Sequence, residues 1–341
     1  MHARETISNT EHERSPRIYV SVISLSVCGS LTMLYLLRPP NVDPITIWPY
    51  WFWSLPAIVL SAFAVSSRNR FWGMMTVGAW FFATLVVAEE PAALARMLTQ
   101  SPPPISARRP PDSMRIVTLN CAGGDVRAAA ESFIWDADIV LLQEAPAAAE
   151  LDALVATRDG WQSSCALDPA ILARGSIAPV PVGQEQAAFV CAADITLPHI
   201  PSMPPVRVIS TRLLLPSLRT RVWLPEVWSD GFEARADREE QMKAVAGFAR
   251  EGLGTMPVIV GGDFNAPAGD SLFRVLQPEF RDAYPEGGAG WPNTITNDTP
   301  MSRIDQVWVS RQFEVESAWV VRTQHSDHRA VVVDLRLVRG H

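Results

Sequence analysis

Three long apolar segments near the start of the chain predict helices that cross a membrane. They span residues 18–37, 45–65 and 71–88, and none of the three contains an acidic or basic residue. Each is about as long as the stretch of roughly 20 residues that crosses a hydrocarbon core. The apolar core of a signal peptide is shorter, so we interpret all three as transmembrane helices. Pro49 and Pro56 leave a buried or re-entrant second segment as the alternative.

The distribution of arginine predicts the orientation of these helices. Arg4, Arg14 and Arg17 precede the first segment, and Arg68 and Arg70 separate the second from the third, whereas the loop between the first two has only Arg38. Cytoplasmic loops carry an excess of basic residues. We therefore expect a cytoplasmic N-terminus, with everything after Ala88 on the extracytoplasmic or periplasmic side of the cell's inner membrane. The arginines at 96, 108 and 109 weigh against this orientation.

Composition divides the chain into four parts. Residues 1–17 form a cytoplasmic tail, 18–88 the three-helix membrane region, 89–111 a linker with a proline-rich end, and 112–341 a soluble domain. From Asp112 onward there are 30 acidic and 20 basic side chains, a formal charge of about −10. Such a domain has no general electrostatic attraction to polyanions, although a groove within it can still be basic.

Within the soluble domain, short apolar runs predict many strands and few helices. The expected strands are 114–120, 137–145, 187–192, 206–214, 258–261, 303–309 and 330–337, and the expected helices are 126–135 and 235–251. Many short strands with few intervening helices favour a layered α/β arrangement of stacked sheets.

Cysteine usage adds little to this picture. Cys28 falls in the first apolar segment, and the spacing of Cys121, Cys165 and Cys191 contains no zinc-binding pattern. In an oxidising periplasm Cys165 and Cys191 could form a disulfide. Two unpaired residues are the equally acceptable alternative.

Polar side chains gather where the predicted strands end. The run Val258–Val260 leads into two glycines that let the backbone turn sharply. Seven polar residues stand at or beside such strand ends: Asn120, Glu144, Asp263, Asn265, Asp305, Asp327 and His328. All but the histidine offer hard oxygen donors, which suit Mg²⁺ or Mn²⁺ completed by water and a substrate phosphate.

Six short motifs follow one another along the soluble domain: R-I-V-T-L-N, D-I-V-L-L-Q-E, R-E-E-Q, G-G-D-F-N-A-P, S-R-I-D-Q-V and H-S-D-H-R-A-V. In kind and in order they resemble the motifs of the endonuclease/exonuclease/phosphatase superfamily of metal-dependent phosphoesterases, whose members include DNase-I-like nucleases. The resemblance covers residues 115–337. It implies a DNase-I-like, four-layer α/β/β/α sandwich, here preceded by three transmembrane helices.

The resemblance also implies a role for each residue. Glu144, Asn120 and Asp327 would hold the metal ion, which polarises a phosphoryl oxygen. Asp263 would orient or deprotonate the attacking water while Asn265 donates to the phosphate. In the pair of Asp305 and His328, the carboxylate would hold the imidazole in one tautomer, in its charged form, so that it stabilises the transition state or donates a proton.

One position departs from the family pattern. Members usually carry Thr-His at the end of a central strand, and this chain has Thr211-Arg212. Arginine can clamp a phosphate but cannot donate a proton near neutral pH. Either Arg212 acts electrostatically and His328 suffices, or the site has lost much of its activity. Arg174 is a weak candidate for a further phosphate contact.

The sequence thus predicts a Mg²⁺-dependent (or Mn²⁺-dependent) hydrolase, integral to the membrane, that cleaves a phosphodiester or phosphomonoester. Nucleic acids, phospholipid head groups and small phosphodiesters all remain possible substrates. The alternative is a catalytically impaired binding or scaffold module of the same fold.

Overall fold

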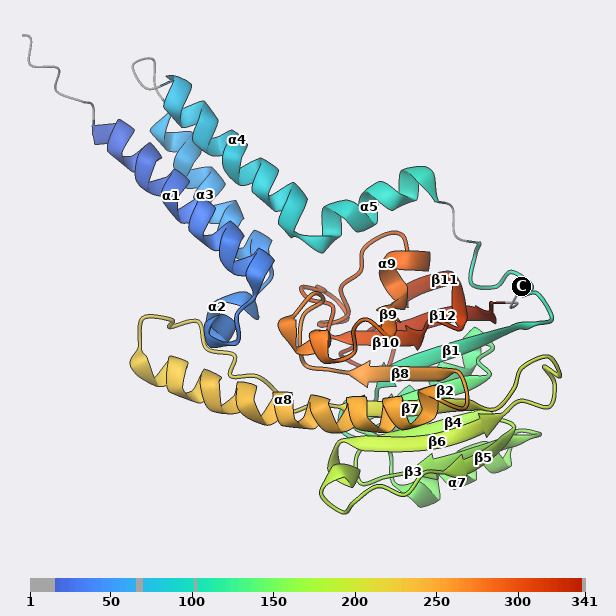
Figure 1. Cartoon of the computed structure of the whole chain (residues 1–341). Coiled ribbons are helices and arrows are strands. Elements are labelled where there is room, and N and C mark those ends of the chain that lie inside the picture. The colour runs from blue at the N-terminus through green and yellow to red at the C-terminus, as the bar shows by residue number, and fades with distance from the viewer. Residues whose placement is uncertain (1–15, 66–69, 101–102, 339–341) are drawn as a thin grey trace, which may run out of the picture. The chain divides into compact units, whose positions relative to one another are not determined.

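The computed structural model describes residues 16–65, 70–100 and 103–338, so the predicted cytoplasmic tail lies almost wholly outside the described residues. The described chain divides into two compact units. One comprises residues up to Leu36 together with Tyr50–Ala88, and the other comprises Leu37–Pro49 and everything from Glu89 onward. Figure 1 shows the elements of both.

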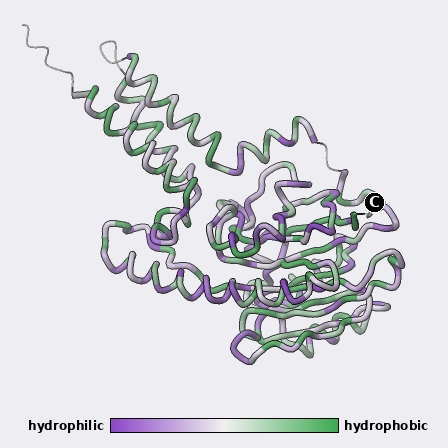
Figure 2. Tube along the Cα trace, in the orientation of Figure 1, coloured by the Kyte–Doolittle hydropathy of each residue, from purple (hydrophilic) through white to green (hydrophobic). Residues whose placement is uncertain are grey.

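The first unit is a bundle of three helices: α1 (Pro16–Leu37), α3 (Tyr50–Ala64) and α4 (Arg70–Val87). Figure 2 shows hydrophobic residues along all three. Small polar side chains link them, because Ser24 bonds to Ser61 at 3.1 Å and Thr84 donates to Ser54 at 2.8 Å. Such bonds are typical of helices that associate in an apolar environment.

Two of these helices, Ile18–Leu37 and Arg70–Val87, are long and apolar enough to cross a membrane. The second predicted span differs from the expectation. Its first residues form α2 (Asp43–Thr46), and α3 begins only at Tyr50, after a bend of 58°. Pro49 explains the break, since the residue before a proline is pushed out of the helical region. A helix of 15 residues is about 22 Å long, so a third span requires both pieces.

The second unit contains two six-stranded mixed sheets. One has the strand order β11-β12-β1-β2-β4-β3 and the other the order β5-β6-β7-β8-β10-β9, with β1 parallel to β2 and β7 parallel to β8. The strands are β1 (Ser113–Asn120), β2 (Ile139–Gln143), β3 (Trp161–Cys165), β4 (Ala170–Arg174), β5 (Ser176–Pro179), β6 (Val190–Thr196), β7 (Val206–Arg212), β8 (Val258–Asp263), β9 (Phe280–Asp282), β10 (Asp305–Ser310), β11 (Phe313–Val321) and β12 (Ala330–Leu337).

Helices flank the two sheets. The longest is α8 (Pro225–Leu253), which begins ten residues before the predicted helix. The others in this unit are α5 (Glu89–Thr99), α6 (Val126–Glu131), α7 (Ala148–Ala156) and α9 (Ala283–Gly287), with short 3₁₀ turns η1 (Pro40–Val42), η2 (Ser132–Trp135), η3 (Gln186–Ala188) and η4 (Ser271–Val275). Sequence reasoning missed β3, β4, β5, β9, β11, α5, α7 and α9.

Alternating side chains on the strands build the layers. Ile116 and Ile259 point into a core between the sheets, whereas Val117 packs with α6 on one outer face and Val260 packs with Met242 of α8 on the other. Successive strand residues face opposite sides, so each buried strand contributes to two cores. The unit is therefore two mixed sheets flanked by helices, consistent with a DNase-I-like sandwich.

Two segments expected to be membrane or linker belong to this unit. Residues 37–49 pack on α8, where Asp43 pairs with Arg235 at 3.0 Å and also bonds to Arg238. Residues 89–99 are helical, and Glu90 accepts a bond from Asn293 at 2.8 Å. The bonds of Asp43 and Glu90 to buried partners therefore hold both segments against the second unit.

The four cysteines are free. Cys165 is exposed, and Cys191 is buried in the core between the sheets. Cys165 and Cys191 are therefore unpaired in the structure, which is one of the two alternatives that the sequence left open.

Candidate active site

The polar residues meet because strand ends from both sheets point to one place. Asn120 closes β1, and Glu144 directly follows the parallel strand β2. In the other sheet Arg212 pairs in register with Asp263, and Asp263 pairs with Asp305. The sheets join at this edge, since Asn120 Nδ2 lies 3.1 Å from Asp263 Oδ2.

The two glycines before Asp263 are required by close packing. A Cβ on Gly261 would come within 2.6 Å of Leu141, across the interface between the sheets. Gly262 has a φ of +149°, and a Cβ there would lie 1.9 Å from the carbonyl oxygen of Thr211. Only glycine lets β7 and β8 approach so closely just before Asp263.

Glu144 is held by several donors. Its carboxylate accepts bonds from Arg212 at 2.6 Å, from the Gly123 backbone at 2.6 Å and from Asn120 Nδ2 at 3.2 Å. Its backbone has a φ of +44°, a conformation that is costly for a residue with a Cβ and often found at functional sites. The carboxylate is therefore fixed in one orientation at the mouth of the site.

Asp168 is a member of the site that sequence reasoning missed. Its carboxylate accepts a bond from the backbone of Glu144 at 3.1 Å and from Arg212 at 3.2 Å. Burial raises the pKa of this carboxyl group, while the Arg212 guanidinium opposes the shift. Arg212 thus bridges two carboxylates, and no sequence motif indicates the second one.

Asp263 lies at the centre of the site and is buried. Burial and the neighbouring Asp305 carboxylate raise its pKa to about 7, and His328 opposes that rise. Its Oδ1 accepts the backbone N–H of Asn265 at 2.9 Å. A carboxylate with a pKa near neutrality is suited to accept a proton from water.

Asn265 does not present its amide nitrogen to the site's carboxylates. It donates from Nδ2 to the carbonyl of Leu213 at 2.8 Å, and its own backbone has a φ of +46°. Its carbonyl accepts a bond from Arg238 at 3.1 Å. Its predicted contact with a phosphate stays a prediction.

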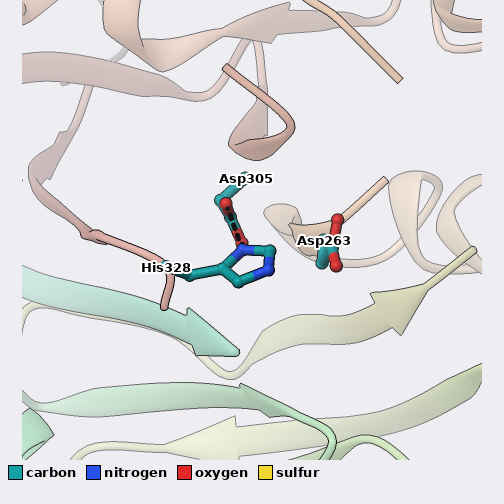
Figure 3. A group of neighbouring side chains, drawn as sticks. All are labelled: Asp263, Asp305 and His328. Atoms are coloured by element: carbon teal, nitrogen blue, oxygen red, sulfur yellow. Dashed lines mark hydrogen bonds and ion pairs between the residues drawn. The ribbon is translucent and has the colours of Figure 1, made fainter. Parts of the chain in front are cut away.

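Asp305 and His328 form a buried pair. The Nδ1 atom of His328 lies 2.9 Å from Asp305 Oδ2. Burial lowers the pKa of His328, but the Asp305 carboxylate outweighs it and raises that pKa to about 10. Figure 3 shows the imidazole lying between Asp305 and Asp263. The ring is therefore charged at neutral pH, and its Nδ1–H donates to Asp305.

Asp263, Asp305 and His328 also have ligand atoms within 4.8 Å of one another, as a metal site would. The Nδ1 atom of His328 already faces Asp305, so the ring would present its Nε2 atom to an ion or to a phosphate.

The wider site suits a hard divalent cation. Carboxylates of Glu144, Asp168, Asp263 and Asp305 outnumber the cationic groups Arg212 and His328. Such an excess of negative charge and oxygen donors is typical of Mg²⁺ sites. The amide oxygen of Asn120, however, accepts the backbone N–H of Ala122 at 2.9 Å, so its amide nitrogen faces the carboxylates. In this arrangement Glu144 is the best-placed ligand and Asn120 acts as a donor that bridges it to Asp263.

Asp327 lies beside the cluster, not within it. It is exposed and lines a polar cavity of about 680 Å³ with Asn297, Arg322 and Ser326. Its negative charge contributes to the raised pKa of His328. The predicted metal role of Asp327 stays a prediction.

Arg174 does not belong to the site. β4 runs antiparallel to β2, so that Leu142 pairs with Ala170 and Ile139 pairs with Ala173. Arg174 therefore lies at the end of the sheet opposite Glu144, and its weak assignment as a phosphate contact is wrong.

Comparison with known proteins agrees with this geometry. The model of the Endonuclease/Exonuclease/phosphatase family matches residues 117–328, which include every one of the strand-end residues above. The chain belongs to this family. Members of the family are hydrolases that act on phosphoester bonds. A comparison with curated proteins found no match.

Solved structures of family proteins share the fold. An endonuclease/exonuclease/phosphatase from Beutenbergia cavernae is 19% identical, with a TM-score of 0.50 over 66% of this chain and 72% of its own. A family protein from Bacteroides thetaiotaomicron is 15% identical, with a TM-score of 0.52 over 68% and 100%. A mannosyl-6-phosphatase from the same species is 15% identical, with a TM-score of 0.51 over 65% and 99%. At these identities the likeness establishes the fold alone.

Proposed function

We propose that the chain is a membrane-anchored, divalent-metal-dependent phosphoesterase that hydrolyses a phosphodiester or phosphomonoester. The observation that carries the proposal is the Asp263, Asp305 and His328 cluster. It combines a carboxylate whose pKa is raised to about 7 with an imidazole whose pKa is raised to about 10. One is suited to accept a proton near neutral pH, and the other stays charged there.

The proposed chemistry assigns one task to each group. Asp263 orients the attacking water and takes its proton, and the Asn120 amide holds the Asp263 carboxylate at 3.1 Å. His328, fixed by Asp305, stabilises charge on the phosphoryl oxygens and gives its proton to the leaving oxygen. A Mg²⁺ or Mn²⁺ ion bound at Glu144 would polarise the phosphoryl group.

Arg212 has a specific consequence for this proposal. Its guanidinium bonds to Glu144 at 2.6 Å and to Asp168 at 3.2 Å, so it takes up oxygen atoms that a metal ion needs. The same pairing favours the alternative, a catalytically impaired binding module. In an active enzyme, a substrate phosphate would draw the guanidinium away from Glu144, since arginine binds phosphate well, and Glu144 would then be able to hold the ion.

Purified full-length protein in detergent separates the two functions. We expect turnover of bis-p-nitrophenyl phosphate with Mg²⁺ or Mn²⁺, no turnover with EDTA, and loss of turnover in Asp263→Asn. Glu314→Gln is the matched control, because Glu314 forms an exposed ion pair with Arg336 on the far edge of the first sheet. Inactivity of the wild-type protein on phosphodiesters, phosphomonoesters, lipids and nucleic acids would establish the binding module instead.

The same preparation identifies the substrate class. A nuclease degrades plasmid with a rate that falls steeply as salt rises, because phosphate contacts release counterions. A lipid phosphodiesterase releases phosphorylated head groups from vesicles, and a phosphatase releases inorganic phosphate from sugar or inositol phosphates.

A further inference from the structure

An unusual number of large apolar side chains is exposed between β7 and the second turn of α8. They are Leu214, Leu215, Leu218, Trp223, Leu224 and Phe232, with Trp223 at 74% and Leu215 at 62% of full exposure. A soluble monomer seldom exposes several such residues together. We call these six residues the apolar patch.

The segment between the first two apolar helices is fixed next to this patch. Asp43 pairs with Arg235, one helical turn beyond Phe232 on α8. Pro44 lies against the same helix, where a Cβ on Gly231 would come within 2.8 Å of Pro44 Cγ. Figure 1 shows α2 beside the N-terminal part of α8. The start of α8 and the residues around Asp43 therefore move as one body.

Chain connectivity then limits how far the patch can be from a bilayer. The first candidate span ends at Leu37, six residues before Asp43, and α3 begins at Tyr50, seven residues after it. An extended chain covers at most about 3.5 Å per residue, so both points lie within about 25 Å of Asp43. If these helices enter a membrane, the part of α8 that Asp43 contacts therefore stays within reach of its surface.

The chemistry of the patch fits the interface of a bilayer. Tryptophan and leucine partition into the region between head groups and acyl chains. Arg219 and Arg221 can extend to lipid phosphates, but Glu226 and Asp230 balance their charge, and Arg219 pairs with Asp230 at 2.9 Å. Apolar insertion, not attraction between net charges, is the interaction that this composition supports.

The segment that carries the patch directly follows, in the chain, residues that contact the candidate site. The N–H of Leu213 donates to the carbonyl of Asp263 at 3.0 Å, and its own carbonyl accepts from Asn265 at 2.8 Å. The residue before it is Arg212, which bonds to Glu144. A patch seated in the interface would therefore hold the catalytic centre at the level of lipid head groups.

We propose that the apolar patch inserts into the surface of the bilayer that anchors the chain, and so directs the enzyme to phosphate esters at that surface. This inference rests on the membrane anchor of the proposed function. The bilayer is the proposed binding partner of the patch. The experiment below would also detect a second copy of the chain bound there instead.

The test places a fluorescent probe on full-length protein reconstituted into phosphatidylcholine and phosphatidylglycerol vesicles. Cys165→Ser removes the exposed cysteine, since the other three are buried. Leu218→Cys and Trp223→Cys each carry an NBD label, and Ile134→Cys is the control, because Ile134 is 68% exposed on η2 beside the other sheet. Lipids with a quencher on the acyl chain report the depth of each label.

We expect quenching at 218 and 223 to exceed that at 134 at least about twofold, with little change in high salt because insertion is apolar. Equal quenching at all three positions would overturn the inference. Self-quenching at 218 that grows with the protein-to-lipid ratio would assign the patch to a second copy and would overturn it too.

Two further measurements keep this inference separate from the proposed function. If the protein does not float with vesicles, the membrane anchor of the proposed function is contradicted. If it floats but the labels at 218 and 223 are not quenched by the lipids, only the insertion of the patch is contradicted. Among floating proteins, we expect Leu218→Asp with Trp223→Asp to slow turnover of a phosphate ester in the bilayer about tenfold while leaving turnover of bis-p-nitrophenyl phosphate unchanged. Equal slowing on both substrates would argue against a role in reaching the lipid surface.

Discussion

The buried pair of Asp43 and Arg238 offers a sharp test of how the catalytic unit is built. The side chain of Arg238 is fully buried, and that of Asp43 is 6% exposed. Arg238 also donates to the backbone carbonyl of Asn265 at 3.1 Å, two residues after Asp263. A residue from the loop between two apolar helices thus supports the loop that follows Asp263 in the candidate site.

Asp43→Asn removes the charge and keeps the shape. Arg235 retains Asp270 at 2.7 Å, but Arg238 loses the one carboxylate to which it bonds among the described residues. Removing one partner of a buried ion pair costs about 3–5 kcal/mol, because the other charge stays buried without compensation. For a unit of this size each kcal/mol lowers Tm by about 2–4 °C, so we expect a decrease of about 6–20 °C.

The assay is thermal unfolding of the full-length protein in detergent, followed by tryptophan fluorescence. Asp298→Asn is the control, since Asp298 pairs with Arg322 on the surface with both side chains mostly exposed. Exposed pairs contribute about 0–1 kcal/mol, so its Tm should stay within about 4 °C of the wild type. If Asp43→Asn unfolds at the same temperature as Asp298→Asn, residues 37–49 are not part of the folded catalytic unit and the prediction is refuted.

Three further predictions concern the catalytic centre. His328→Gln should slow turnover by about 10²–10⁴-fold with little change in KM, and a loss of less than tenfold would exclude His328 as the proton donor. Arg212→Gln should lower the Mg²⁺ concentration for half-maximal activity about fivefold, as about 1 kcal/mol of competing ion pair is lost; an unchanged Mg²⁺ titration would refute the competition. The raised pKa of His328 contributes stability that is complete below pH 6.5 and is lost as pH rises through about 10. Tm should therefore fall over that range, and Asp305→Asn should flatten the decrease; equal slopes would contradict the role of the pair.

That the polar residues of the candidate site lie together could be predicted in large part, because they are tied to strand ends. A strand such as Val258–Val260 is recognisable by its apolar side chains, and the residues directly after it must lie at the edge of a sheet. The predicted strands beginning at 114, 206 and 330 are confirmed within a few residues. This logic, with the family resemblance, predicts that Glu144, Asp263, Asp305 and His328 lie close together, and their catalytic and metal roles stay predictions.

The sequence did less well where an element is amphipathic only in part or held by distant partners. β3 and β5 are partly exposed, so they lack an apolar run. β4 is short and buried on both faces, so its side chains do not alternate between apolar and polar. Apolar length alone extended the second membrane segment to Ile45. It could not reveal that Asp43, two residues earlier, is buried against arginines almost two hundred positions away.

What the sequence determined by itself is the family, the strands that carry the candidate site and the polar residues at the ends of those strands, because these follow from local patterns of side chains. Tertiary structure alone decided which charges compensate one another. Arg212 pairs with Glu144 and Asp168, and Asp43 pairs with Arg238, because burial makes an uncompensated charge costly and the nearest partner in space is far away in the chain. The second pairing joins the loop between the apolar helices to α8, beside the candidate site.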